Sequence, residues 1–209
     1  SFYDRREVRD LLAYLKVFTA PQDEVSLLRI LNAPPRGISK PAQTALVQGA
    51  TLAGKPAYEL LANAGSIDGV SPKAATAMQD FRDLVDSYKK QFSRTKDLVE
   101  TIRKLINQIG YLEEVKRRYP DAGDCEARLA AVEQLISAAG SYQRETASRS
   151  LQGFLDATLL DQRDQTEDEK RNAVFLMTLH AAKGLEFPHV YLAGMEEGLL
   201  PHHRAVADE

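Results

Sequence analysis

The feature that most constrains the fold is a long stretch in which apolar side chains return every three or four positions. It runs from about Ser71 to Leu159, with only short polar or glycine breaks. This spacing places side chains on one side of an α-helix. Serine followed by proline, as at Ser71, is a typical helix start. The stretch therefore predicts a succession of amphipathic helices, with apolar positions that include Met78, Phe81 and Ile102.

Two further helices are predicted nearer the N-terminus, over residues 2–18 and 24–32. Asp4 and Asp23 are their expected N-caps, because a carboxylate there accepts a free backbone N–H. A short turn containing prolines and one glycine, residues 34–40, then leads to a helix that starts near Pro41, with Ser39 as its expected N-cap. These elements indicate an all-helical body.

The pattern changes after residue 160. Residues 161–171, DQRDQTEDEKR, contain no apolar side chain and predict a solvated loop or linker. Residues 173–179 and 189–194 are apolar runs of strand length. Because two strands rarely stand alone, they indicate part of a larger sheet. The predicted fold class is mainly α, an all-helical domain flanked by incomplete α/β segments.

Composition limits the broad class of protein. The chain is 44% hydrophobic and 27% charged, which is typical of a globular protein. No apolar run approaches the roughly 20 residues of a membrane span, so we expect no membrane partner. A single cysteine, Cys125, fits a cytoplasmic protein. The net charge of −3 argues against a surface that binds nucleic acid everywhere, and leaves a local basic site open.

Three segments carry a family resemblance. Residues 174–201 read VFLMTLHAAKGLEFPHVYLAGMEEGLLP, residues 2–15 read FYDRREVRDLLAYL, and residues 28–38 read LRILNAPPRGI. In the first, the informative letters are Thr-x-His, Lys-Gly-Leu-Glu-Phe and Gly-x-x-Glu-Gly-x-x-Pro. All three resemble segments of UvrD/Rep/PcrA-like superfamily 1 DNA helicases, in the same order.

The resemblance implies a domain organisation and a function. Residues 1–19 and 172–209 would belong to the second RecA-like motor domain, called 2A, of the P-loop NTPase type. Residues 20–171 would form the inserted all-helical domain 2B. The chain is then expected to be a fragment of an ATP-dependent 3′–5′ DNA helicase. The alternative is an autoinhibitory or protein-interaction module of a helicase or helicase–nuclease, without duplex contact.

The C-terminal motif implies nucleotide and single-strand contacts. The resemblance assigns Glu186, with Gly184 beside it, to the nucleotide, where a carboxylate can accept hydrogen bonds from ribose hydroxyls. It assigns Thr178 and His180, at the end of a predicted strand, to single-stranded DNA. Lys183 would add charge there. From the residues alone, an exposed turn glutamate and a structural histidine are the more ordinary readings.

The turn between helices is the candidate duplex contact. A glycine in such a turn lets backbone N–H groups approach a phosphate, and flanking cations add charge. The turn resembles the family's Gly-Ile-Gly element, except that serine replaces the second glycine, which puts the geometry in question. An ordinary interhelical turn is the competing reading. The residues concerned are Arg36, Gly37, Ile38, Ser39 and Lys40.

The expected cofactors are ATP and Mg²⁺ in the complete enzyme. The chain itself lacks a GxxxxGKS/T phosphate loop and a full set of catalytic motifs, so we expect it not to hydrolyse ATP. The expected partners are single-stranded DNA and its junction with duplex, together with repair or replication proteins. A zinc site is not expected, because His189, His202 and His203 lack a recognised ligand spacing.

Overall fold

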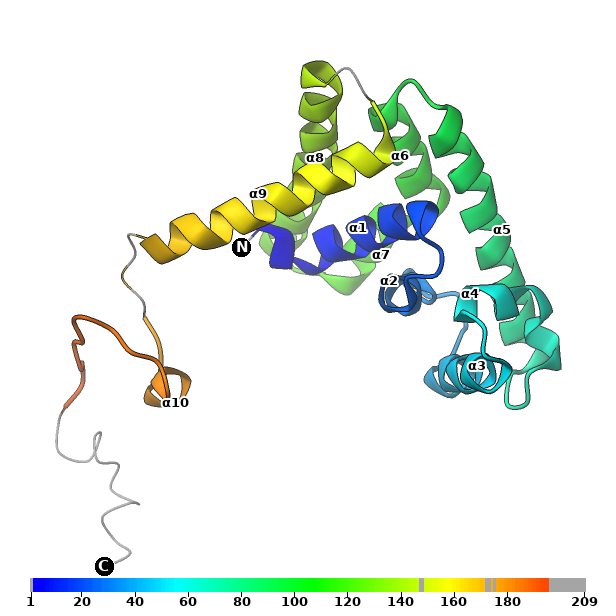
Figure 1. Ribbon diagram of the computed structural model, residues 1–209, viewed down its shortest axis with the longest axis horizontal. Helices are drawn as coiled ribbons and strands as arrows, with labels where there is room; N and C mark the ends of the chain where they lie inside the picture. The colour runs from blue at the N-terminus through cyan, green and yellow to red at the C-terminus, as the bar shows by residue number, and fades with distance from the viewer. Residues whose placement is uncertain (1, 147–148, 172–173, 175, 196–209) are drawn as a thin grey trace, which may run out of the picture. The chain divides into compact units, whose positions relative to one another are not determined.

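The computed structural model describes residues 2–146, 149–171, 174 and 176–195. It divides into two compact units, residues 1–169 and 170–209. The first unit is built from helices (Figure 1). In chain order the helices are η1 (Phe2–Asp4), α1 (Arg6–Thr19), α2 (Glu24–Ile30), α3 (Lys40–Ala53), α4 (Ala57–Leu60), η2 (Leu61–Ser66), α5 (Pro72–Arg94), α6 (Leu98–Gln108), α7 (Tyr111–Arg118), α8 (Ala122–Glu145), α9 (Leu151–Arg171) and, in the second unit, α10 (Leu179–Ala182).

Helix α1 forms the centre of the first unit. Ten of its 14 residues are buried, so it is covered on nearly every side rather than along one stripe. It packs on α2, α5 and α8. The predicted all-helical body is therefore confirmed, with α1 as its innermost helix.

Aromatic side chains join α1 to the long helix α5. Phe18 stacks on Tyr88 and Phe92, with both pairs of ring centroids 5.5 Å apart. One turn earlier, Tyr14 meets Phe81 edge-on at 6.5 Å. Large rings in such offset and edge-on contacts dominate the energy of a core. These contacts position the middle and the C-terminal part of α5 relative to α1.

The predicted caps are partly right. Asp23 accepts a hydrogen bond from the Ser26 backbone N–H at 3.1 Å, and Ser71 accepts one from Ala74 at 3.2 Å. The Asp4 cap is wrong, because Asp4 ends a separate 3-10 turn and α1 starts after Arg5 without a side-chain cap. The local capping pattern was outweighed by tertiary packing of the first turn of α1.

The predicted linker over residues 161–171 is also wrong, because α9 continues to Arg171. The start of α9 is anchored by Leu151, Phe154 and Leu155, which are buried. Once a helix is nucleated, each further residue extends it at little cost, and Gln, Glu, Lys and Arg are good helix formers. A charged run without glycine or proline can therefore continue a helix.

The two predicted strands are not formed in the part of the chain that the structure describes. Residues 174 and 176–178 are coil leading into α10, and residues 190–194 are also coil. Their apolar side chains are exposed, for example 98% for Leu176 and 93% for Tyr191. A strand needs a neighbour for its backbone N–H and C=O groups. Without such a neighbour among the described residues, these apolar runs do not form strands.

The boundary between the expected domains 2A and 2B stays a prediction. Residues 1–19 and 20–169 belong to the first unit, whereas the expected C-terminal 2A piece, residues 172–209, belongs to the second. Among the described helices, none is long and apolar enough to span a membrane.

Phe18→Ala should lower the free energy of unfolding by roughly 3–5 kcal/mol, because it removes a ring that is 3% exposed and stacked on two others. Urea unfolding followed by circular dichroism measures this. Val25→Ala is the matched control, since Val25 is 82% exposed and should change stability by less than about 0.5 kcal/mol. Equal effects of the two substitutions would contradict the described core.

Candidate nucleic-acid interface

The turn between α2 and α3 is held from inside by one amide side chain. Asn32 Oδ1 accepts hydrogen bonds from the backbone N–H of Arg36 at 2.6 Å and of Ile38 at 3.2 Å. Ile38 is fully buried and accepts a hydrogen bond from Gln43 Nε2 at 3.2 Å through its carbonyl. Ile38 therefore anchors the turn in the core and is not available to touch DNA with its side chain.

Arg36 points into the protein. Its Nη1 donates to the backbone carbonyls of Ile30 at 2.9 Å and Pro34 at 3.1 Å, and its Nη2 donates to the Tyr14 hydroxyl. The guanidinium carbon lies 5.1 Å from the Phe81 ring centroid. Burial raises the pKa of Tyr14 to about 12, so its phenol stays neutral beside the cation. In the structure the Arg36 side chain closes the end of α2, while its assignment to DNA stays a prediction.

Gly37 presents its backbone at the surface. Its φ is +83°, a conformation that side chains with a Cβ rarely adopt. A Cβ placed there would lie 3.7 Å from Lys73 Cε, so the start of α5 comes next to the turn. Sequence reasoning missed Lys73, because it lies 36 positions further along the chain. The turn and the start of α5 together form one exposed surface.

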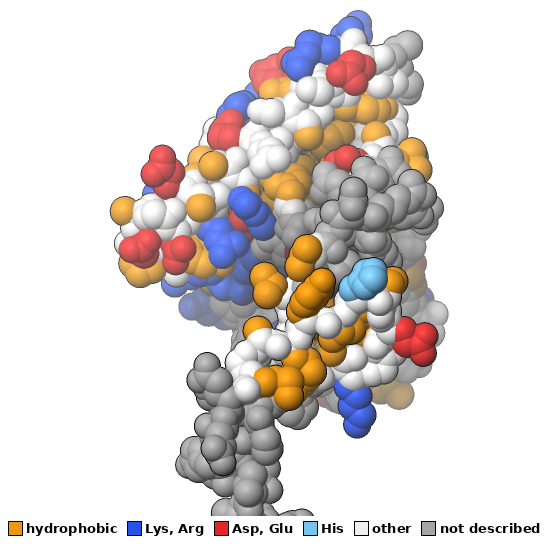
Figure 2. All heavy atoms as spheres, turned by 90° about the vertical axis from the view of Figure 1, so that its left-hand side faces the viewer, with side chains coloured by type: hydrophobic (Ala, Val, Ile, Leu, Met, Phe, Trp, Pro, Cys, Tyr) orange, Lys and Arg blue, Asp and Glu red, His pale blue; other side chains and the backbone are white. Residues whose placement is uncertain are grey.

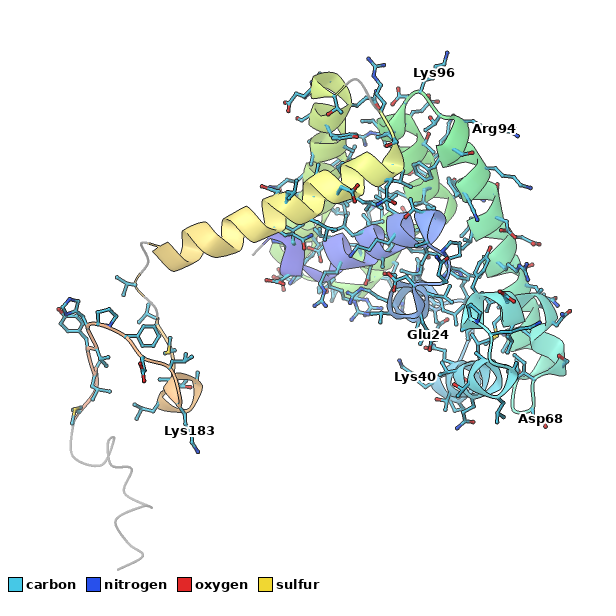
Figure 3. The ribbon with its side chains drawn as sticks, in the orientation of Figure 1. Glu24, Lys40, Asp68, Arg94, Lys96 and Lys183 are labelled. Carbon is cyan, nitrogen blue, oxygen red and sulfur yellow. The ribbon has the colours of Figure 1, made fainter. Side chains whose placement is uncertain are left out.

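Ser39 stands where the family's Gly-Ile-Gly element has its second glycine, and its backbone conformation shows whether glycine is needed there. Its φ of −69° and ψ of 162° are ordinary extended values, so this position does not require glycine. Its Oγ accepts the Ala42 backbone N–H at 3.3 Å and caps α3 as predicted. Lys40, next along, is exposed, and Figure 3 shows its side chain extending away from α3. Gly37, Ser39, Lys40 and Lys73 are thus exposed members of this surface, and two of them are cations.

The second unit contains the other group of candidate residues. Thr178 caps the short helix α10, since its Oγ1 accepts the Ala181 backbone N–H at 3.2 Å. Gly184 follows α10 with a φ of +86°. Thr178, Lys183 and Glu186 are all exposed. The side chain of His180 lies outside the described residues, as do Glu197, Gly198, Pro201, His202 and His203.

Hydrophobic side chains surround this group on the second unit. Leu185 is 55% exposed and Val190 67% exposed. Figure 2 shows hydrophobic side chains gathered on one surface of this unit. Within the described residues, no group of three His, Cys, Asp or Glu side chains is placed to hold a metal ion. The motif is therefore presented on a surface that exposes both its polar and its apolar members.

A buried polar network, which sequence reasoning missed, joins α1 to its neighbours. Asp10 is 4% exposed. Its carboxylate accepts a hydrogen bond from the Tyr111 hydroxyl at 2.8 Å and pairs with Arg29 Nε at 2.8 Å. Burial first, and the Asp10 charge second, raise the pKa of Tyr111 far above its usual value, so the phenol stays a donor. The signal was present in the sequence, because Asp10 shares a helix face with Tyr14.

A second buried carboxylate completes the network. Glu7 is 1% exposed and pairs with Arg128 of α8 at 3.4 Å. Glu114 of α7 pairs with Arg117 at 2.6 Å and Arg118 at 2.7 Å. Because each buried carboxylate has a cationic or phenolic partner, the network has a structural role and does not offer a free acid or base.

Comparison with known proteins identifies the family. The UvrD-like helicase C-terminal domain family matches residues 1–209. The chain is 34% identical over 215 residues to the ATP-dependent DNA helicase PcrA of Bacillus subtilis (strain 168), covering 100% of this chain and 29% of that protein. It is 35% identical over 213 residues to the ATP-dependent DNA helicase PcrA of Staphylococcus aureus (strain Mu50), covering 100% of this chain and 28% of that protein.

The fold and the motifs thus define a helicase domain with an all-helical body. The chain belongs to the UvrD-like helicase C-terminal domain family. It spans less than a third of the length of the curated relatives it matches. The predicted family resemblance is confirmed along the whole chain.

Arg36→Met should lower the free energy of unfolding by roughly 2–3 kcal/mol, because it leaves buried carbonyls at the end of α2 without a donor. Urea unfolding is the measurement. Lys40→Met is the control, and should change stability by less than about 0.5 kcal/mol, because Lys40 is exposed. If Arg36→Met is as stable as the control, the inward guanidinium does not support the turn.

Proposed function

We propose that this chain is part of an ATP-dependent 3′–5′ DNA helicase and that its all-helical unit holds duplex DNA through the turn at residues 37–40. The observation that carries the proposal is the exposed Gly37 backbone beside Lys73, with Lys40 three residues further on. Both relatives named above are described as ATP-dependent DNA helicases.

The chemistry of this surface suits a phosphate backbone. Most contacts to duplex DNA go to phosphate oxygens, from lysine or arginine and from backbone N–H groups. A glycine permits close approach of the backbone to a phosphate. Neither Lys40 nor Lys73 has an acidic partner among the described residues, so both charges are available to a polyanion. Such contacts fix position on DNA without reading its sequence.

For the second unit we propose contacts to single-stranded DNA and to nucleotide. Thr178, His180 and Lys183 would supply a hydroxyl, an imidazole and an ammonium group to the tracked strand. Glu186, with Gly184 in the same turn, would accept hydrogen bonds from the nucleotide ribose. The exposure of Thr178, Lys183 and Glu186 supports these roles. ATP with Mg²⁺ would be bound mainly by motor segments other than this chain.

A protein-interaction or autoinhibitory module is the second candidate. A groove of about 510 Å³ lies along α3, α4 and η2. Leu52 on its wall is 90% exposed, and Gly49, Leu60 and Ile67 also line it. An apolar groove rimmed by polar groups suits a peptide or a second domain. Under this reading the turn at residues 37–40 is structural and duplex affinity does not depend on it.

The double variant Lys40→Gln/Lys73→Gln should weaken duplex binding on the order of tenfold or more, because two phosphate contacts are lost. Fluorescence anisotropy of the 209-residue chain with labelled blunt duplex, at several salt concentrations, measures this. The salt dependence should also become shallower by about two contacts. Both residues are exposed, so the fold should be retained.

The matched control is Lys104→Gln/Lys116→Gln. These two lysines are exposed and pair with Glu100 at 2.7 Å and Glu113 at 3.4 Å. The control removes the same net charge from another part of the same unit. Equal loss in both double variants, or no loss in either, would contradict a duplex site at the turn and favour the interaction module.

Glu186→Gln in the complete helicase should raise the Kd for ATP roughly tenfold, because a charged acceptor of ribose hydroxyls is lost. Binding of a fluorescent ATP analogue tests this, with the 2′-deoxy analogue as the second ligand. The variant should discriminate less between the two analogues than the parent does. Unchanged affinity and unchanged discrimination would remove Glu186 from the nucleotide site.

A further inference from the structure

Several cations of the first unit pair with carboxylates. Ion pairs join Arg82 to Asp86, Arg103 to Glu133, Lys104 to Glu100, Lys116 to Glu113, Arg117 and Arg118 to Glu114, and Arg128 to Glu7. Exposed cations without an acidic partner among the described residues include some at both ends of α5. At its N-terminal end they are Lys40 and Lys73, which belong to the surface already described.

At the C-terminal end of α5 such cations are Lys89, Lys90, Arg94 and Lys96, of which the last three lie nearest the end of the helix. All three are exposed, and none has an acidic partner within the residues that the structure describes. Figure 3 shows the side chains of Arg94 and Lys96 pointing outwards from this end of the unit. We call these three residues the distal cluster.

The backbone that bears the distal cluster is held in place. Thr95 Oγ1 donates to the Asp97 carbonyl at 2.9 Å, and the Leu98 backbone N–H donates to Gln143 Oε1 of α8 at 2.7 Å. The nearest carboxylate in sequence, Asp97, is occupied in capping α6, where it accepts the Glu100 N–H at 3.0 Å. The cations therefore project from a segment whose backbone is held by hydrogen bonds, and Asp97 does not form an ion pair with them.

The dipole of α5 explains only part of this cluster. The negative C-terminal end of a helix favours cations within its last turn, by about 0.3–1 kcal/mol each. Arg94 lies in that turn, and Lys90 lies one turn earlier. Lys96 lies beyond the helix, where the dipole does not require a cation. A ligand with several negative charges accounts for all three.

The length of α5 sets the distance between its two cationic ends. Lys73 is its second residue and Arg94 its last, so a rise of 1.5 Å per residue separates them by about 32 Å. At 100° per residue they lie about 60° apart around the axis, on the same side. One turn of B-DNA is about 34–36 Å long. A strand of duplex that passes the Gly37 turn would therefore return to the protein near Arg94.

Carboxylates between the two ends restrict how DNA could lie. Asp80 and Asp83 are exposed on α5 between Lys73 and Lys90. A continuous polyanion along the whole helix would be repelled there, whereas a duplex presents a groove between successive passes of one strand. A duplex that contacts both ends of α5 but not its middle would meet the cations and avoid Asp80 and Asp83.

We propose that the distal cluster, Lys90, Arg94 and Lys96, is a second phosphate-binding surface for duplex DNA, one helical turn from the Gly37 turn. This proposal rests on the duplex contact proposed above. Its role is to bind duplex that extends beyond the first contact, so that α5 acts as a spacer between two points on the same DNA.

The test compares two DNA lengths with the 209-residue chain. One probe is a hairpin whose stem is about half a helical turn, and the other a blunt duplex of about two turns, roughly 70 Å. The triple variant Lys90→Gln/Arg94→Gln/Lys96→Gln should weaken binding to the long duplex on the order of tenfold or more, with a salt slope shallower by about three contacts. Binding to the short stem should not change. Thermal unfolding checks that the fold is retained.

The control is Arg103→Gln/Lys104→Gln/Lys116→Gln, which removes the same charge from cations that have acidic partners. Unchanged affinity of the distal variant for the long duplex, or a loss no larger than that of the control, overturns the proposal. Loss of binding to polyglutamate with DNA binding retained also overturns it, in favour of an acidic protein partner. If only Lys40→Gln/Lys73→Gln weakens both probes, the Gly37 contact stands and the distal contact fails.

Discussion

The structure depends on the burial of helix α1. Its apolar residues cannot reach water on any side, so α2, α5 and α8 must cover it. The same burial includes the carboxylates of Asp10 and Glu7, which would be costly without partners. Tyr111 and Arg128 supply those partners from α7 and α8. A single buried helix therefore dictates where four others lie.

The duplex surface follows from this core. Arg36 uses its guanidinium to satisfy carbonyls at the end of α2 and to contact Tyr14 and Phe81. With that cation inside, the outward groups of the turn include the Gly37 backbone and Lys40. The aromatic contacts of α1 with α5 then bring Lys73 beside them. The proposed phosphate site is thus assembled from separate segments on a rigid support.

The second unit shows the opposite relation between sequence and structure. Its motif was the strongest signal in the chain, yet its apolar residues are exposed and its described part has no strand. A sheet is a property of several segments, since each strand depends on the hydrogen bonds of the next. Family membership over residues 1–209 accounts for the sequence motif, and the described residues do not supply a neighbouring strand for its apolar runs.

The sequence by itself determined the helical body, three of its starts and its family, because helix periodicity, caps and motif letters are local. It could not determine which cations face outwards. Arg36 and Lys40 look alike in a turn, and only packing shows that the first is drawn inside and the second left exposed. Lys73, remote in the chain, joined the surface for the same reason. Asp10 shares a helix face with Tyr14, but its partners Arg29 and Tyr111 come from α2 and α7, so only the packing of these helices gave it a structural role.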